Sequence, residues 1–368
     1  MDNKARIIAY YLPQFHPIPE NNKWYGMGFT EWTNVGRAKP LFKGHYQPRV
    51  PANLGYYDLR LPVVREMQAK MAREAGIEGF CYWHYWFGNG KELLERPFKE
   101  VLETGSPDFP FCLAWANTQW IANGWNPDDK RKAQVMMKQL YPGDEDIKLH
   151  FERYEKAFSD NRYIRVENKP LFVIYRPFNY PEVNHFISLW NNMIKEKGIA
   201  DSFYFVACTD GEDEHDKAMD LGFDAITSNP IKRMRKEIDK QTRLSYYFWR
   251  AIQLITKRPM KVIEYKDAIK HIFTKEDMKE ESIPILMPNW DRSPRAGKYA
   301  VIWHNSTPKL FKKHVIDVLN GVKKKENKLI FLKSWNEWAE GNYMEPDLEF
   351  GNGYLNALHD ALIETNNM

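Results

Sequence analysis

Cysteine is scarce in this sequence: only Cys81, Cys112 and Cys208 occur among 368 residues. Their number is odd and no two of them have the C-x-x-C spacing, so the sequence indicates neither a disulfide framework nor a zinc site. Each cysteine lies within a short apolar run, which is typical of a buried thiol. This usage favours a reducing compartment.

A long apolar run is also missing, because no stretch approaches the roughly 20 residues that span a bilayer. The chain passes directly into a short apolar segment that begins at Arg6, without the apolar region of a signal peptide. We therefore expect a soluble, cytoplasmic protein with no stable membrane insertion. The basic segments 232–236 and 323–325 could at most give a weak peripheral attraction to an anionic membrane surface or an acidic glycan.

An excess of one charge is absent as well, since 53 basic residues face 49 acidic ones and the net charge is +4. This balance gives no support for binding of nucleic acid. His16, His45, His84 and His304 show no paired ligand spacing, so we predict no metal and no cofactor. The sequence gives no indication of the oligomeric state.

Aromatic and apolar residues, in contrast, are abundant. Aromatics make up 15% of the chain, including 13 tryptophans, and this number exceeds the need of a core, so we expect many rings to line a cleft. Eight apolar runs recur at fairly even spacing, and several are continuous, as in parallel strands buried on both faces. They span residues 6–12, 79–83, 111–115, 171–175, 203–207, 225–227, 285–287 and 329–332.

Helical patterns separate most of these runs. Eight strand–helix units predict an α/β fold, a single (β/α)8 TIM barrel formed by residues 1–368. A doubly wound sheet is the alternative, but no G-x-G-x-x-G turn follows the first strand. The predicted helices span residues 61–74, 144–158, 181–197, 212–221 and 308–325.

Two additions interrupt the regular pattern. A long loop after the first strand, residues 13–58, is rich in Pro, Gly and aromatics, and we predict that it belongs to the active site. A basic, helical insertion after the sixth strand, residues 231–282, carries the aromatic run 246–249. It could form a wall of the cleft, a partner surface or a plain pair of surface helices.

Polar and aromatic residues gather where the predicted strands end. In a (β/α)8 barrel these ends converge on one mouth, where active sites form. A single residue of this kind, such as His84, is more often structural, but eight such strand ends together indicate a site. The residues are Gln14, His16, Glu20, His84, Tyr85, Asn117, Arg176, Asp210, Asn229, Asn289, Trp290, Asp291, Glu337 and Glu340.

The segment 331–341 after the last strand is the most informative of these ends. It places Glu337 and Glu340 three positions apart, framed by Trp335, Asn336 and Trp338. Paired carboxyl groups supply the acid and the base of glycoside chemistry, and indole faces stack on sugar rings. The simpler alternative, solvated glutamates at a helix start, fits poorly with the preceding strand and the tryptophans. We predict that Glu337 and Glu340 are catalytic.

The sequence resembles the WbsX-like family, which is similar to glycoside hydrolase family 99, the endo-α-mannosidases and endo-α-mannanases. The resemblance covers about residues 6–360 and implies a (β/α)8 barrel that acts on glycans, with further residues of the motifs and strand ends contacting the sugar. Four motifs carry it: Y-L-P-Q-F-H-P at 11–17, G-F-T-E-W at 28–32, F-C-Y-W-H-Y-W at 80–86 and W-N-E-W at 335–338. The predicted substrate-binding residues are Tyr11, His16, Glu31, Trp32, His84, Tyr85, Asn117, Asn289, Trp290, Trp335, Asn336, Trp338 and Glu345.

The resemblance also implies the roles of the two carboxyl groups. Glu337 would deprotonate the 2-hydroxyl of the substrate and give a 1,2-anhydro sugar, while Glu340 would protonate the leaving group and then activate water. The anomeric configuration would be retained, and Glu345 would support the site. Many WbsX-like chains read W-A-N-E-N-W after the third strand, whereas this one has Thr118 and Gln119 in place of the Glu-Asn pair. We expect this change to alter substrate preference.

Three functions remain open at this point. The leading hypothesis is a glycoside hydrolase of a bacterial polysaccharide. The alternative is a glycosyltransferase or transglycosylase of O-antigen or capsule assembly, which cytoplasmic placement favours, although the sequence has neither a D-x-D after a strand nor a phosphate-binding glycine loop. The third is a glycan-binding barrel without catalysis. In each case we expect a glycan as the ligand.

Overall fold

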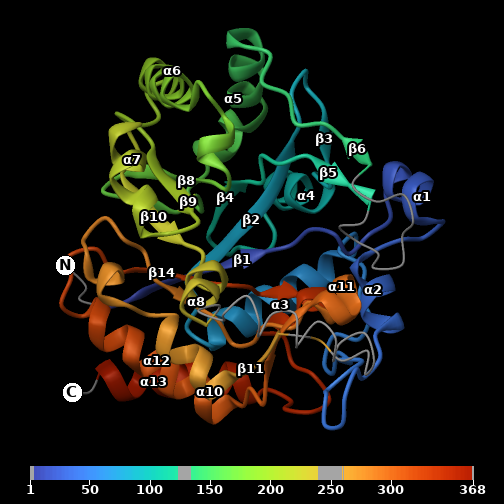
Figure 1. Ribbon diagram of the computed structural model, residues 1–368. Helices are drawn as coiled ribbons and strands as arrows, with labels where there is room; N and C mark the ends of the chain where they lie inside the picture. Colours follow the sequence, from blue (N-terminus) through green and yellow to red (C-terminus); the bar gives the residue numbers. More distant parts are fainter. Residues whose placement is uncertain (1–3, 123–133, 239–258, 260, 367–368) are drawn as a thin grey trace, which may run out of the picture.

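The computed structural model describes residues 4–122, 134–238, 259 and 261–366 (Figure 1). Its central feature is a parallel sheet in which all eight predicted strands are present. Their order around the sheet is β10, β9, β8, β4, β2, β1, β14 and β12. The strands are β1 (Arg6–Tyr11), β2 (Gly79–Trp86), β4 (Phe111–Trp115), β8 (Lys169–Ile174), β9 (Tyr204–Thr209), β10 (Ala225–Ser228), β12 (Ile285–Leu286) and β14 (Leu329–Leu332).

The sheet curls into a barrel that is nearly closed. The first and last strands of the barrel are neighbours, because β1 pairs in parallel with β14 and Ile8 lies opposite Phe331. On the other side, the amide of Ile226 in β10 donates to the carbonyl of Glu281 at 2.7 Å, and the amide of Ile283 donates to the carbonyl of Ile226 at 2.8 Å. These bonds join β10 to the segment before β12. The (β/α)8 barrel is therefore confirmed.

Helices surround the barrel, and one of them begins with a side-chain cap. In the helix that begins at Pro308, the hydroxyl of Thr307 accepts from the amide of Leu310 at 3.3 Å. The predicted helix at 212–221 differs, because residues 212–214 form a 3-10 turn and the α-helix begins only at His215. The helices around the barrel are α3 (Pro62–Glu74), α4 (Arg96–Thr104), α5 (Asp144–Phe158), α6 (Val183–Glu196), α7 (His215–Asp220), α12 (Pro308–Val322) and α13 (Gly353–Asn366).

The long loop after β1 folds over the segment that carries the two glutamates. It contains α1 (Pro19–Tyr25) and α2 (Glu31–Arg37). The Trp32 ring lies 5.4 Å from that of Trp338, and the Tyr57 hydroxyl donates to Glu345 at 2.8 Å. The loop thus packs against the segment that carries the two glutamates, and residues 13–58 do not line the cavity at the barrel mouth.

The insertion after β10 contains α8 (Pro230–Ile238), β11 (Lys261–Glu264) and α10 (Tyr265–Ala268). The prediction of a helical insertion is incomplete, because β11 pairs in parallel with β13 (Val301–His304). Residues 246–249 lie outside the described residues. Among the helices described, none is long and apolar enough to cross a membrane.

Short strands and one short helix complete the fold. They are β3 (Glu92–Leu93), β5 (Trp120–Ile121), β6 (Val135–Met137), β7 (Arg165–Val166), β15 (Asn336–Glu337), β16 (Asn342–Tyr343) and α11 (Ser293–Ala296). Of these, β7 lies at the amino end of β8.

Candidate active site

A cavity opens at the carboxyl ends of the barrel strands, where the sequence predicts the site. Its volume is about 240 Å³, and Glu337 and Glu340 both contribute to its wall. Aromatic rings and cationic side chains form much of the rest. The lining residues are Leu12, Trp83, Tyr85, Ala116, Thr118, Gln119, Trp120, Ile121, Tyr175, Arg292, Arg295, Lys333, Glu337 and Glu340.

Glu337 lies in β15, immediately above the barrel. The indole Nε1 of Trp83 donates to its Oε1 at 3.0 Å. Burial and the nearby charge of Glu340 raise the pKa of Glu337 to about 7, although Lys333 and Arg295 oppose the shift. This carboxyl group therefore changes protonation state near neutral pH.

Glu340 has the opposite electrostatic environment. Arg295 Nη1 lies 2.8 Å from its Oε1, and Arg292 Nε lies 3.3 Å away. Burial acts to raise the pKa, but these guanidinium groups, Lys333 and a hydrogen bond with Glu337 lower it to about 2. Two carboxyl groups in such contact share one proton, which in this arrangement resides mainly on Glu337.

Arg295 connects the cavity to the long loop. Its Nη2 donates to both carboxylate oxygens of Glu31, at 2.7 and 2.9 Å. Glu31 also accepts from the amide of Ala339 at 3.0 Å, and it is fully buried. Glu31 therefore lies behind the cavity wall, where it orients Arg295 and the backbone between the two catalytic candidates.

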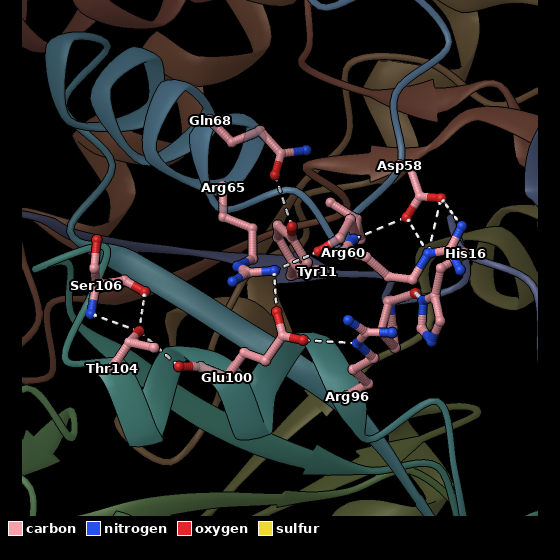
Figure 2. A network of polar contacts seen from close by, with 12 residues as sticks. Tyr11, His16, Asp58, Arg60, Arg65, Gln68, Arg96, Glu100, Thr104 and Ser106 are labelled. Carbon is pink, nitrogen blue, oxygen red and sulfur yellow. Dashed lines mark hydrogen bonds and ion pairs between the residues drawn. The ribbon is translucent and has the colours of Figure 1, made fainter.

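A buried network holds Trp338 beside the site. Its indole donates to Glu345 at 2.6 Å, and Glu345 also accepts from Tyr57 at 2.8 Å and Gln68 at 2.6 Å. Figure 2 shows the Tyr11 hydroxyl pointing toward Gln68 on α3, at 2.7 Å. Burial raises the pKa of Glu345 to about 7. Of these residues, the predicted Tyr11, Trp338 and Glu345 do not line the cavity.

Asn336 joins the first and last strands of the barrel. Its Oδ1 accepts from the amide of Leu12 at 2.7 Å, and its Nδ2 donates to the Leu12 carbonyl at 3.0 Å. The neighbouring Trp335 is fully buried and its ring lies 5.3 Å from that of Phe80. Both residues belong to the frame of the site.

Asp291 fixes the backbone of Glu340. Its amide donates to the Glu340 carbonyl at 2.7 Å. Its carboxylate accepts from Gln47 at 2.7 Å and lies 2.8 Å from His45 Nε2. Burial acts to raise the pKa of Asp291, but His45, Arg49 and Ser293 lower it to about 2. Asp291 followed a predicted strand, but the sequence did not indicate this anchoring role.

Other predicted site residues lie away from the cavity. His84 Nε2 is 2.9 Å from His150 Nε2 on α5, and burial lowers the pKa of His84 to about 3. His16 Nδ1 lies 3.1 Å from the Pro13 carbonyl, beside the charged group around Asp58 in Figure 2.

Four further predicted residues also lie outside the cavity wall. Asn117 is fully buried, and its side chain hydrogen-bonds the backbone of Arg176. Asn289 accepts from the amide of Trp290 at 2.7 Å. Trp290 packs beneath Lys333, whose Nζ lies 5.4 Å from the ring centroid. Trp32 is half-buried and donates to the Tyr57 carbonyl at 2.8 Å.

Among the predicted residues, Tyr85 joins Glu337 and Glu340 in the cavity wall. Thr118 and Gln119, which replace the Glu-Asn pair of many WbsX-like chains, line the same cavity. Trp83 was missed, although the alternation of β2 could have indicated it. Side chains two apart in a strand share a face, so Trp83 accompanies Tyr85 while His84 faces the helices. Arg292, Arg295 and Lys333 carried no comparable signal.

Among the described residues, no group of three His, Cys, Asp or Glu side chains is placed to hold a metal ion. A barrel that combines two coupled carboxyl groups with indole and phenol rings at its carboxyl end has the architecture of carbohydrate-active barrel enzymes. The chain matches the glycosyltransferase WbsX family over residues 7–358 and belongs to this family, as its motifs predicted.

Two curated relatives from Xanthomonas campestris pv. campestris strains, both named uncharacterized protein WxcX, are 35% and 34% identical over 371 residues. The alignments cover 97% of this chain and 50% of each relative, so the chain spans about half their length.

Solved structures share the fold at low sequence identity. A glycoside hydrolase-like protein superposes with a TM-score of 0.61 at 15% identity, covering 98% of this chain and 94% of the other. The GH99 endo-α-mannosidase of Bacteroides thetaiotaomicron gives 0.60 at 13% identity, covering 100% and 98%. These similarities concern the barrel fold.

Proposed function

We propose that this protein is a glycoside hydrolase of the endo-α-mannosidase type that acts on a bacterial polysaccharide or oligosaccharide. The observation that carries the proposal is the convergence of Glu337 and Glu340 on one aromatic cavity at the carboxyl end of the barrel. Trp83, Tyr85 and Trp120 provide flat apolar faces against which the C–H face of a pyranose can pack.

The placement of the two carboxyl groups in one cavity favours a substrate-assisted reaction. Retaining enzymes that form a covalent glycosyl-enzyme keep their carboxyl groups about 5–5.5 Å apart, on opposite sides of the sugar. Here Glu337 and Glu340 belong to one short segment and line one cavity, and the charge of Glu340 raises the pKa of Glu337, so we expect them to approach a bound sugar from one side. In this geometry the 2-hydroxyl of the sugar can serve as the internal nucleophile.

The first step then has the following balance. Glu337 removes the proton from the 2-hydroxyl, the 2-oxygen forms a bond to C1, and the glycosidic C1–O bond breaks as Glu340 protonates the leaving oxygen. In the second step Glu340 removes a proton from water, the water oxygen bonds to C1 as the bond between C1 and the 2-oxygen breaks, and the 2-oxygen recovers its proton from Glu337. Two displacements at C1 retain the anomeric configuration.

The two reaction steps need one proton on the pair of carboxyl groups. They need it on Glu340, but in the free protein it lies mainly on Glu337. Catalysis requires an ionised Glu337 and a protonated Glu340, so the proton has to move from Glu337 to Glu340 when substrate binds. Arg295 opposes this transfer and favours the state in which Glu340 acts as a base. The ion pair therefore suits the second step directly.

Transfer is the second candidate, and the family to which the chain belongs favours it, since that family is named for a glycosyltransferase. A sugar hydroxyl in the place of water would give a transglycosylation with the same two carboxyl groups. The donor would be a glycan or a lipid-linked sugar, for example in O-antigen or capsule assembly.

One experiment separates the two candidates. The purified protein is incubated with α-manno-oligosaccharides and bacterial surface glycans in ¹⁸O-water, with and without nucleotide sugars, and products are measured by mass spectrometry. We expect one ¹⁸O atom at a new reducing end. We expect Glu340→Gln to lower the rate by about two to four powers of ten, because general acid–base catalysis contributes that much.

Glu145→Gln is the matched control, because the Glu145 side chain is 92% exposed on α5. Unlabelled, lengthened products would establish transfer instead of hydrolysis. An unchanged rate in Glu340→Gln would remove this residue from the mechanism.

A further inference from the structure

Cationic side chains are concentrated in the wall of the candidate active site. Arg292, Arg295 and Lys333 line the same cavity as Glu337 and Glu340. Arg295 is neutralised by Glu31 behind the wall and by Glu340 in front of it. The Arg292 side chain also reaches Glu340, but 45% of it is exposed at the rim.

Lys333 differs from the two arginines because no carboxylate pairs with it directly. It follows β14, and within the described ranges its ammonium makes neither a salt bridge nor a hydrogen bond. It lies over the Trp290 ring, with Nζ 5.4 Å from the ring centroid. Burial opposes its charge, but Glu337, Tyr175 and Glu340 raise its pKa, so the ammonium stays protonated.

An ammonium in this position costs free energy unless an anion or several hydrogen-bond acceptors approach it. The lining residues Thr118 and Gln119 carry no charge and add hydrogen-bonding groups without competing for the ammonium. A ligand that brings its own negative charge to Lys333 would complete the cavity.

We propose that the cavity accepts a glycan with an anionic group, a carboxylate or a phosphate, close to the bond that reacts, and that Lys333 binds this group. Arg292 lies at the rim, where it can contribute a second donor. The inference rests on the proposed glycan chemistry and adds the charge of the substrate to it.

Matched pairs of probes test the proposal by isothermal titration calorimetry at low salt. D-glucuronate is compared with D-glucose, and mannose 6-phosphate with mannose, so that the two arms distinguish a carboxylate from a phosphate. We expect at least one anionic probe to bind about 10- to 100-fold more tightly than its neutral partner, as one charge-assisted hydrogen bond allows. Equal binding within both pairs, including no binding at all, would overturn the proposal.

Variants then assign the preference to Lys333. Lys333→Met removes the charge and keeps the length, and we expect it to abolish the preference for the anionic over the neutral probe. Lys333→Arg restores a cation and should recover the preference. Lys313→Met, at an exposed lysine of α12, is the matched control. A preference that persists in Lys333→Met would overturn the assignment, and thermal unfolding verifies that each variant is folded.

The two proposals fail in different ways. Turnover of neutral glycans that depends on Glu340, with no preference for an anionic probe, would refute the anionic substrate and leave the hydrolase proposal intact. A preference for the anionic probe that depends on Lys333, without turnover of any glycan, would support the anion site and refute the hydrolase proposal.

Discussion

Arg295 determines, at the scale of single residues, how protons are distributed in the site. One side of its guanidinium group binds Glu31 and the other binds Glu340. Because this cation stabilises an ionised Glu340, the single proton of the pair resides on Glu337, whose pKa is about 7. A residue outside the catalytic motif thus sets the charge of the two residues within it.

The double variant Glu31→Gln, Arg295→Met tests this dependence without leaving a buried charge unpaired. Loss of the cation disfavours the doubly ionised pair, so we expect the upper pKa of the pair to move from about 7 to a higher value. Carbon-13 NMR titration of glutamate-labelled protein measures this value, and loss of the signal in Glu337→Gln assigns it. A pKa that stays near 7 in the double variant would contradict the role of Arg295.

The sequence indicated some of these residues and not others, for a physical reason. Glu337 and Glu340 occur in one short motif, so their proximity follows from the chain itself. Arg295 lies in α11, a helix of four residues with no periodic pattern to distinguish it. Lys333 was visible only as the residue after a strand. Their meeting depends on loop conformations that the local sequence does not reveal.

At the scale of elements, a buried ion pair stabilises the insertion after β10. Arg233 in α8 donates to both carboxylate oxygens of Asp277, at 2.6 and 3.2 Å. Asp277 also accepts from the amide of Thr274 at 2.8 Å, which caps the turn that follows. The same region packs closely on α12, since a Cβ added to Gly321 would lie 2.2 Å from the Phe273 ring.

Asp277→Asn leaves the buried Arg233 without its counter-charge. We expect a loss of about 3–5 kcal/mol in the free energy of unfolding, the usual effect of breaking one half of a buried pair. Urea denaturation measures it. Asp267→Asn is the matched control because its ion pair with Lys270 is exposed, so we expect little change in the free energy of unfolding. If Asp277→Asn lowered the free energy of unfolding no more than Asp267→Asn, the insertion would not depend on the pair of Arg233 and Asp277.

Elements differ in how well the sequence predicted them. The barrel strands were recognisable because strands buried on both faces are continuously apolar, as in Phe111–Trp115. The strand β11 was not, because Lys261–Glu264 is only partly buried and its partner β13 lies about 40 residues further along the chain. Pairing of this kind is a tertiary effect that a local pattern does not contain.

At the scale of the whole molecule, the barrel requires close backbone approaches between neighbouring strands. Gly79 begins β2, and a Cβ at this position would lie 2.4 Å from the Pro110 carbonyl oxygen and 2.8 Å from the Ile164 side chain. Neither neighbour can move freely, because both belong to the layer around β4. The glycine is therefore required by space, since its φ angle is not positive.

We expect Gly79→Ala to destabilise the protein by about 1–3 kcal/mol or more, the range of overpacked cores. Gly36→Ala is the contrasting control, because nothing lies within 4 Å of a Cβ added there in α2. Alanine should stabilise that helix by about 0.5–1 kcal/mol. Thermal unfolding of the two variants gives the comparison, and equal shifts would contradict the steric argument.

The seam between β1 and β14 has a consequence for biosynthesis. Asn336 binds the backbone of Leu12 across 324 positions of sequence. On a translating ribosome, β1 emerges first and exposes an unpaired edge until the last barrel strand has left the exit tunnel. The nascent chain therefore completes the catalytic pocket only after nearly all of the barrel has been synthesised, and throughout that interval its first strand is a target for chaperones.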